Sequence, residues 1–242
     1  MPETLLEVRD IHTYYGDSYV LQGLSLEVAA GRIVAILGRN GMGKTTLIRS
    51  VAGLTPPREG ELVFKGRSLR GRPPYAIAQE GIALVPQGRR IFRSLSVREN
   101  LLLPTSGLAR PRQGAWTLEA VLAKFPQLGE RIHHPGGALS GGEQQMLAVG
   151  RALMANPELI LMDEPSEGLS PKLVQQVQEI MDSLRAHGHA VLLVEQNFAL
   201  AMALADTIYV LSAGRFVFQG TPAALAAETE VLDQHVGVAR AP

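Results

Sequence analysis

The sequence contains no cysteine, and it carries no net charge at neutral pH because 23 basic residues balance 23 acidic ones. Without cysteine the chain can form neither a disulfide nor a thiolate-ligated metal centre. The missing cysteines also fit a reducing compartment. A balanced charge argues against a nucleic-acid-binding protein, whose binding face is usually strongly basic. We therefore expect no nucleic acid among the partners of this chain.

Long apolar runs are missing as well. The longest candidates, such as 198–205, fall well short of the roughly 18 residues that a membrane-spanning helix needs. Residues 1–7 are acidic and interrupted, unlike a secretory signal, which starts with basic residues and continues into a longer apolar run. Heptads, internal repeats and low-complexity tracts are absent too. We expect a chain that is soluble by itself and that associates with a membrane only through a partner.

A glycine-rich loop is the clearest motif that the sequence does contain. Residues 38–46 fit G-x-x-x-x-G-K followed by Ser or Thr, the pattern of phosphate-binding loops. The apolar run 33–37 before it predicts a buried strand, and 46–52 after it predicts a helix. In such a loop, backbone N–H groups point at phosphate oxygens and the helix N-terminus adds partial positive charge. The predicted nucleotide-binding residues of the loop are Gly38, Arg39, Asn40, Gly41, Met42, Gly43, Lys44, Thr45 and Thr46.

Two residues of this loop have distinct expected roles. Lys44 is expected to reach the β- and γ-phosphates, which makes it a candidate catalytic residue. The hydroxyl of Thr45 is expected to bind Mg²⁺.

Four short apolar runs predict an α/β fold with a central parallel sheet, because uninterrupted apolar strands are typical of sheets covered on both faces. These runs are Ile33–Leu37, Ile82–Val85, Leu159–Met162 and Ala190–Val194. Residues 5–37 read as strands, and the alternation over 19–28 predicts an N-terminal antiparallel β-subdomain. Residues from about 88 to 155 look helical, and we expect them to form a helical subdomain inserted into one domain over 5–237.

Several local signals predict where individual elements begin. Capping-box spacing at Ser96 and Ser140 predicts two helix starts, and Ser170 before a proline predicts a third. The segments 208–211 and 216–218 flank Ala-Gly and predict a hairpin.

Loops are expected over 104–114, 133–137 and 187–189. Histidines occur in the last two, but no carboxylates cluster with them. Solvated loops are therefore expected there rather than metal sites.

An acidic pair, Asp163 and Glu164, directly follows one of the apolar runs. In an open α/β sheet, ligands bind at the carboxyl edge of the strands, where the phosphate loop also lies. Asp163 is then placed to hold Mg²⁺ through water, and Glu164 is placed to polarise an attacking water. Phosphoryl transfer needs a metal, a phosphate cradle and an oriented nucleophile, and this sequence predicts all three.

A second anion-binding motif appears in the run Leu139-Ser140-Gly141-Gly142-Glu143-Gln144, because a helix N-terminus with a hydroxyl and two glycines can bind an anion. Together with the phosphate loop, Gln87 and the run ending at Glu164, this order of motifs resembles the ATPase cassette of ABC transporters. The resemblance spans essentially the whole chain. It implies that ATP and Mg²⁺ are the cofactors.

The resemblance also implies individual roles. Gln87 matches the loop glutamine that senses Mg²⁺ and contacts the membrane partner. Ser140 to Gly142 match the signature, which closes over ATP bound to the opposite subunit. Glu164 matches the general base. Tyr15 matches the aromatic that stacks on adenine, although its position in the sequence alone favours a strand residue in the core.

Four runs narrow the resemblance to the importer ATPases for branched-chain amino acids, and to their smaller ATPase subunit. They are Val85–Phe92, Ser140–Ala148, Asp163–Leu169 and Val194–Asn197. The implied partners are a second ABC ATPase subunit, identical or related, transmembrane permease subunits and, indirectly, an external substrate-binding protein. The implied place is the cytoplasmic, inner face of the cell membrane. Closely similar subunits serve urea or short-amide uptake, and these motifs leave the two cargos open.

Three residues depart from the general ABC pattern. Gln196 occupies the switch position, where histidine is usual; its amide can donate to the γ-phosphate but cannot become cationic. We count Gln196 as a candidate catalytic residue and expect slower or differently pH-dependent turnover. Glu143 replaces a common glutamine and suits capping of Ser140. Ser170 replaces a usual aspartate, which leaves open whether two such subunits form equally active sites.

Two other functions compete with transport as an interpretation of these motifs. Non-transport ABC ATPases that act on DNA or ribosomes usually carry a long coiled-coil insertion or two tandem cassettes, and this sequence has neither. A regulatory module that binds nucleotide without turnover would not need Glu164. An importer ATPase is the better expectation.

Overall fold

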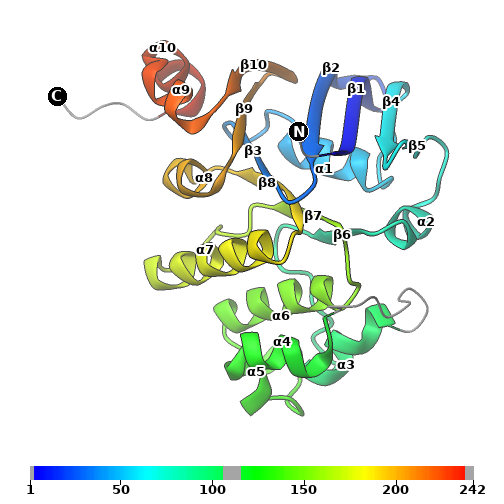
Figure 1. Ribbon diagram of the computed structural model, residues 1–242, viewed down its shortest axis with the longest axis vertical. Coiled ribbons are helices and arrows are strands. Elements are labelled where there is room, and N and C mark those ends of the chain that lie inside the picture. Colours follow the sequence, from blue (N-terminus) through cyan, green and yellow to red (C-terminus); the bar gives the residue numbers. More distant parts are fainter. Residues whose placement is uncertain (1–2, 106–115, 238–242) are drawn as a thin grey trace.

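The apolar runs that predicted parallel strands form the centre of a six-stranded sheet in the computed structural model, which describes residues 3–105 and 116–237 (Figure 1). The strands are β3 (Ile33–Leu37), β6 (Ile82–Val85), β7 (Leu159–Asp163), β8 (Ala190–Glu195), β9 (Thr207–Ser212) and β10 (Arg215–Gly220). Their order is β10-β9-β3-β8-β7-β6, and all neighbours are parallel except the edge pair β9–β10. The predicted hairpin is confirmed as β9–β10, and β9 adds a fifth parallel strand.

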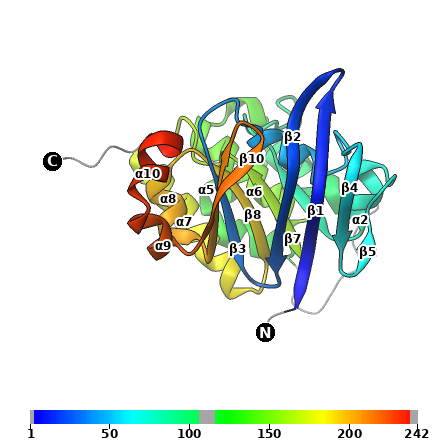
Figure 2. The ribbon, with the colours of Figure 1, turned by 90° about the horizontal axis from the view of Figure 1, so that it is seen from above.

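The N-terminal part of the chain forms a separate antiparallel sheet, as predicted (Figure 2). Its strands are β1 (Thr4–Tyr15), β2 (Ser18–Ala29), β4 (Glu59–Phe64) and β5 (Arg67–Ser68). The long strand β1 pairs with both β2 and β4. Apolar side chains of this sheet share one buried cluster with β7, β8 and helix α1 (Lys44–Val51), so both sheets help to bury the helix that follows the phosphate loop.

The remaining helices lie mainly on the other face of the central sheet, except the one over 74–79, whose Ile77 belongs to the cluster shared with the antiparallel sheet. They are α2 (Pro74–Gln79), α3 (Val97–Leu102), α4 (Leu118–Lys124), α5 (Pro126–Glu130), α6 (Gly141–Leu153), α7 (Pro171–Ala186), α8 (Phe198–Leu204), α9 (Pro222–Ala227) and α10 (Thr229–Val231), with short 3₁₀ segments at Leu103–Thr105 and Gly136–Ala138 and a π-helix at Leu232–Val236. Helices α3 to α6, the helical layer, lie together at the lower end of Figure 1 and confirm the inserted helical subdomain. No helix within 3–105 and 116–237 is long and apolar enough to cross a membrane.

The central strands are apolar without interruption because each side of the sheet is covered. In β7, Leu159 and Leu161 belong to the cluster shared with the antiparallel sheet, whereas Ile160 and Met162 belong to the cluster formed with the helices. Side chains still alternate between faces, as in any strand. Both faces exclude water, so the alternation leaves no polar trace in the sequence.

Local predictions for helix starts are confirmed with one refinement. Ser96 and Ser140 both form complete capping boxes, with the glutamate three residues later accepting from the serine N–H. Ser170 occupies the N-cap position of α7, but its side chain makes no capping hydrogen bond. The predicted loop over 104–114 lies mainly in 106–115, outside the described residues.

One of the loops expected to be solvated is instead anchored. His189 is partly buried: its Nε2 lies 2.8 Å from Trp116 Nε1, and its Nδ1 lies 2.8 Å from the carbonyl oxygen of Pro157. Since the indole N–H can only donate, Nε2 must accept, and the neutral ring donates through Nδ1. The expectation of a solvated loop was wrong for His189 because Trp116, far away in sequence, covers it.

We predict that this contact makes stability depend on pH. Burial lowers the pKa of His189, and the neighbouring His187 acts in the same direction. The unfolded chain therefore binds a proton more readily, so stability is lost as the pH falls below about 6.5. Thermal unfolding between about pH 7.5 and pH 5.5 should show a larger fall in Tm for the wild type than for His189→Gln, which cannot ionise. Equal falls in the two proteins would contradict this assignment.

Candidate functional site

The phosphate loop connects β3 to α1 at the carboxyl edge of the central sheet. Two of its glycines are required by the local geometry. A Cβ on Gly38 would lie 2.3 Å from the carbonyl oxygen of Leu211 in the neighbouring strand β9. Gly43 has a φ of 107°, which is unfavourable for residues with a side chain, and it directly precedes the first helical residue. The helix starts at Lys44, two residues earlier than predicted.

Lys44 is buried inside this loop, with 4% of its side chain exposed. Its Nζ donates to the carbonyl oxygens of Gly38 at 2.9 Å and Arg39 at 3.1 Å. The same atom lies 3.0 Å from Oε1 of Glu164, whose side chain is also buried. The predicted phosphate-binding lysine and the predicted general base thus form a buried ion pair.

Thr45 and Asp163 also meet, although 118 residues separate them in sequence. The hydroxyl of Thr45 donates to Oδ1 of Asp163 at 3.0 Å. Burial raises the pKa of Asp163, and the negative charge of Glu164 adds to this, whereas the hydrogen bond from Thr45 opposes it. A divalent cation would stabilise the charged carboxylate. A hydroxyl and a carboxylate are hard oxygen ligands that suit Mg²⁺.

Gln87 reaches the same edge of the sheet from the end of β6. Its amide nitrogen lies 3.3 Å from Oε2 of Glu164 and 3.0 Å from Oε2 of Glu167. Because the nitrogen faces the carboxylates, the carbonyl oxygen is the atom that could bind a metal. Sequence reasoning missed Glu167, whose part here depends on a contact between distant loops.

A cavity of about 420 Å³ lies over these residues. It is lined by Tyr15, Val20, Asn40, Gly41, Gly43, Lys44, Thr45, Thr46, Gln87 and Glu164. Nine of these ten were predicted as site residues, and only Val20 was not. The core position that sequence alone favoured for Tyr15 is wrong, because 46% of Tyr15 is exposed. Its exposed position on the cavity wall leaves a ring available to a flat ligand.

Other predicted site residues lie outside the cavity lining. Asp163 is in contact with Thr45, which lines the cavity. The sulfur of Met42 accepts a hydrogen bond from the N–H of Ala213, with 3.2 Å between sulfur and nitrogen. Ser140 to Gly142 form the start of α6 in the helical layer, where Glu143 caps Ser140 as expected. Gln196 is exposed just after β8. Gly38 and Arg39 contribute their backbone carbonyls to Lys44.

Sequence reasoning missed Glu195, the last residue of β8. It is 1% exposed, and its carboxylate accepts hydrogen bonds from the loop that follows Glu164. Burial raises its pKa, although hydrogen bonds from Ser166, Asn197 and Gln196 act against this. A charged residue that ends an apolar strand was the available signal, as it was for Asp163.

Comparison with known proteins decides the family. Residues 21–167 match the model of a protein family described as ABC transporter. This chain belongs to the ABC transporter family. The resemblance inferred from the motifs is confirmed, and the chain is an ABC ATPase that binds adenine nucleotide.

Relatives of this ABC ATPase match over nearly the whole chain. The high-affinity branched-chain amino acid transport ATP-binding protein BraG of Pseudomonas aeruginosa is 44% identical and covers 96% of this chain and 100% of its own. A probable branched-chain amino acid transport ATP-binding protein, LivF of Archaeoglobus fulgidus, is 32% identical and covers 90% of this chain and 92% of its own. A solved ATP-binding cassette of an ABC transporter in its ADP conformation superposes with a TM-score of 0.83 at 27% identity. The match covers 95% of this chain and 97% of that cassette.

The close approach at Gly38 yields a prediction about stability. Gly38→Ala places a methyl group against the backbone of β9, and overpacking of this kind costs about 1–3 kcal/mol. We expect a clearly lower Tm and weaker ATP binding. The matched control is Gly129→Ala in α5, where the nearest atom lies 4.0 Å from the new Cβ and no unfavourable φ is involved. That variant should keep its Tm within about one degree or rise slightly; a Tm for Gly38→Ala as high as the control's would refute the argument.

Proposed function

We propose that this ABC ATPase powers the import of branched-chain amino acids. The identity of the cargo is supported by the similarity to two ATP-binding proteins named for branched-chain amino acid transport, each over at least 90% of this chain. Residues 5–237 would act as one ATPase unit, with the helical layer carrying the signature.

The buried pair of Lys44 and Glu164 supports a sequence of events at the site. Lys44 would leave Glu164 for the β- and γ-phosphates of ATP. Glu164 would then hold and deprotonate the attacking water, because it has lost its cationic partner. Thr45, Asp163 and Gln87 would hold Mg²⁺, which supplies neutralising charge on the phosphate oxygens when bound. Tyr15 would stack on adenine at the exposed end of the cavity.

A second ABC ATPase subunit would complete the site. Ser140 at the start of the signature is exposed and lies outside the cavity that holds Lys44, so its hydroxyl could meet the nucleotide of a partner subunit. Its helix N-terminus favours an anion, as a γ-phosphate requires. Gln196, at the switch position, would instead donate a hydrogen bond to the γ-phosphate of the nucleotide held by Lys44 of its own chain.

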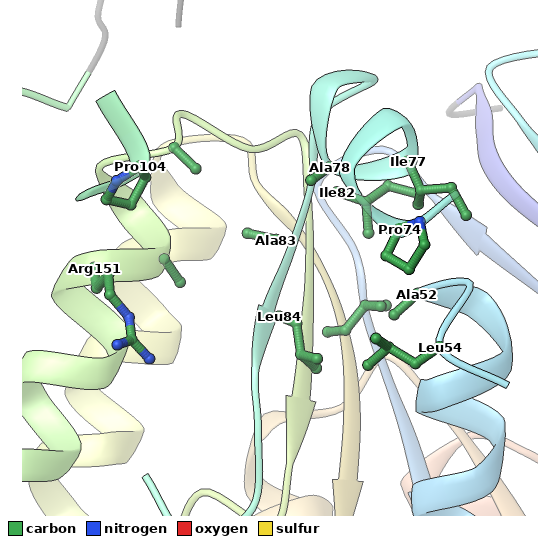
Figure 3. Close-up of a pocket in the computed structure, with 13 residues that line it drawn as sticks. Ala52, Leu54, Pro74, Ile77, Ala78, Ile82, Ala83, Leu84, Pro104 and Arg151 are labelled. Carbon is green, nitrogen blue, oxygen red and sulfur yellow. The ribbon is translucent and has the colours of Figure 1, made fainter. Parts of the chain in front are cut away.

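A second cavity, of about 240 Å³, supports docking of a permease segment (Figure 3). Side chains from α2, β6 and α6 make it apolar, and the guanidinium of Arg151 points into it. Nη2 of Arg151 donates to the carbonyl oxygen of Arg90 at 2.8 Å, while Nη1 is buried without a protein partner. A permease segment with apolar side chains would fit this lining. Such docking would place the chain at the cytoplasmic face of the membrane, with a substrate-binding protein acting from outside.

We predict that Glu164→Gln lowers ATP hydrolysis by about 100-fold or more while ATP still binds, because an amide cannot accept the proton of the attacking water. Gln196→Ala should lower turnover as well, but less. Hydrolysis and nucleotide affinity are measured on the full chain at several protein concentrations. The control, Glu130→Gln, changes an exposed carboxylate in α5 and should hydrolyse ATP like the wild type. Normal hydrolysis by Glu164→Gln would disprove its role as the base.

The cargo prediction needs the whole transporter. Permease subunits should co-purify with this chain from detergent-solubilised membranes. In vesicles that contain the purified complex and its binding protein, leucine, isoleucine or valine should stimulate ATP hydrolysis. Stimulation by urea or a short amide, without an effect of the amino acids, would overturn the proposed cargo but leave the ATPase assignment intact.

A further inference from the structure

Glu195 is a buried carboxylate to which the ATPase mechanism assigns no role. It ends β8, next to Gln196, and 1% of it is exposed. Among the ion pairs found in 3–105 and 116–237, none includes it. A buried charge without a cation is costly unless several hydrogen bonds satisfy it. The partners of Glu195 therefore indicate what it is for.

Four groups donate hydrogen bonds to Glu195, and two of them belong to Ser166, in the loop that carries the proposed general base. The N–H of Ser166 donates to Oε1 of Glu195 at 3.0 Å, and the hydroxyl of Ser166 donates to Oε2 at 2.9 Å. Ser166 follows Glu164 by two residues and is itself buried. The carboxylate thus holds this loop by its backbone and by its side chain.

The other two donor groups are backbone N–H groups in the loop that carries the switch position. Oε2 of Glu195 also accepts from the N–H of Gln196 at 3.1 Å and from the N–H of Asn197 at 3.2 Å. Asn197 in turn caps α8, with its Oδ1 accepting from the N–H of Leu200 at 3.1 Å. One carboxylate therefore fixes both loops to the end of the same strand.

The backbone of Glu164 shows why such a fixture is needed. Glu164 has a φ of 49°, in the left-handed region, which is unfavourable for a residue with a side chain. Conformations of this kind persist only where the surroundings determine them. The N–H of Glu164 donates to the carbonyl oxygen of Val194 at 2.9 Å, and the bonds from Ser166 to Glu195 hold the chain two residues further on.

We propose that Glu195 is a positioning residue, which ties the loop of Glu164 to the loop of Gln196 so that base and switch keep one geometry during hydrolysis. The inference rests on the proposed role of Glu164 as general base. It assigns Glu195 no contact with nucleotide.

The hydrogen bonds explain why the residue must be a glutamate. Three of the four donors are backbone N–H groups, which can only donate, and they face both carboxylate oxygens. Glutamine has one accepting oxygen. In the Glu195→Gln variant, the NH₂ group would face at least one backbone N–H in either orientation of the amide, so flipping the amide cannot restore the bonds.

The test compares Glu195→Gln and Ser166→Ala with the wild-type full chain. Hydrolysis at saturating ATP should fall about 10-fold or more for Glu195→Gln, since small displacements of a catalytic group are costly. Ser166→Ala, which keeps the backbone bond, should show a smaller fall. The Kd for ATP should change less than about 3-fold in both, because the phosphate loop is untouched. In the Glu164→Gln background, Glu195→Gln should cause no further loss, since it acts through Glu164.

The control is Thr221→Ala, which removes the N-cap of α9 and so lowers stability. It should lower the Tm without lowering turnover per folded molecule. If Glu195→Gln and Ser166→Ala behave like this control, the positioning role is wrong and Glu195 only stabilises the fold.

If Glu195→Gln fails to fold, undiminished turnover in Ser166→Ala overturns the proposal and a fall in turnover supports it. Normal hydrolysis by Glu164→Gln would instead refute the base assignment, so the two failures are distinguishable.

Discussion

The site is organised around the buried ion pair between Lys44 and Glu164, 3.0 Å apart. Removing one partner of a buried pair is typically destabilising by about 3–5 kcal/mol, because the other charge is left uncompensated. Two backbone carbonyls of the phosphate loop also accept from Lys44, so the ammonium keeps partners if Glu164 turns away. The glutamate has a weaker second contact, to the amide of Gln87. The pair thus fixes the positions of both side chains, and each has a second partner if the pair separates.

The topology of the central sheet brings these charges together. Strands β3, β7 and β8 are adjacent and parallel, so the residues that follow them meet at one edge. Each of these strands is buried on both faces, which leaves its carboxyl end as the place where polar groups emerge. Asp163 and Glu195 occupy matching ends of β7 and β8. Parallel pairing, more than any single motif, therefore determines which distant residues meet at this edge of the sheet.

Sequence reasoning succeeded where the signal is local. The phosphate loop between β3 and α1, the acidic pair at the end of β7 and the capping boxes at Ser96 and Ser140 each depend on residues within a few positions, and they lie in the elements that were expected. It failed where burial depends on distant segments. The core position favoured for Tyr15 and the solvated loop at His189 were both wrong, because strand ends and loop packing are decided by tertiary contacts. Glu195 was missed because its contact with Ser166, 29 residues earlier in sequence, depends on how two loops pack.

The contact between Trp116 and His189 has a practical consequence. Trp116 is the one tryptophan in the sequence, and it stands just before α4 of the helical layer, while His189 stands just before β8 of the central sheet. Its indole also lies 5.2 Å from the ring of His187, measured between centroids. Indole emission responds to hydrogen bonding and to nearby imidazole rings. The intrinsic fluorescence of Trp116 therefore reports on the contact between the helical layer and the central sheet. Movement of one against the other can be followed without an added fluorophore.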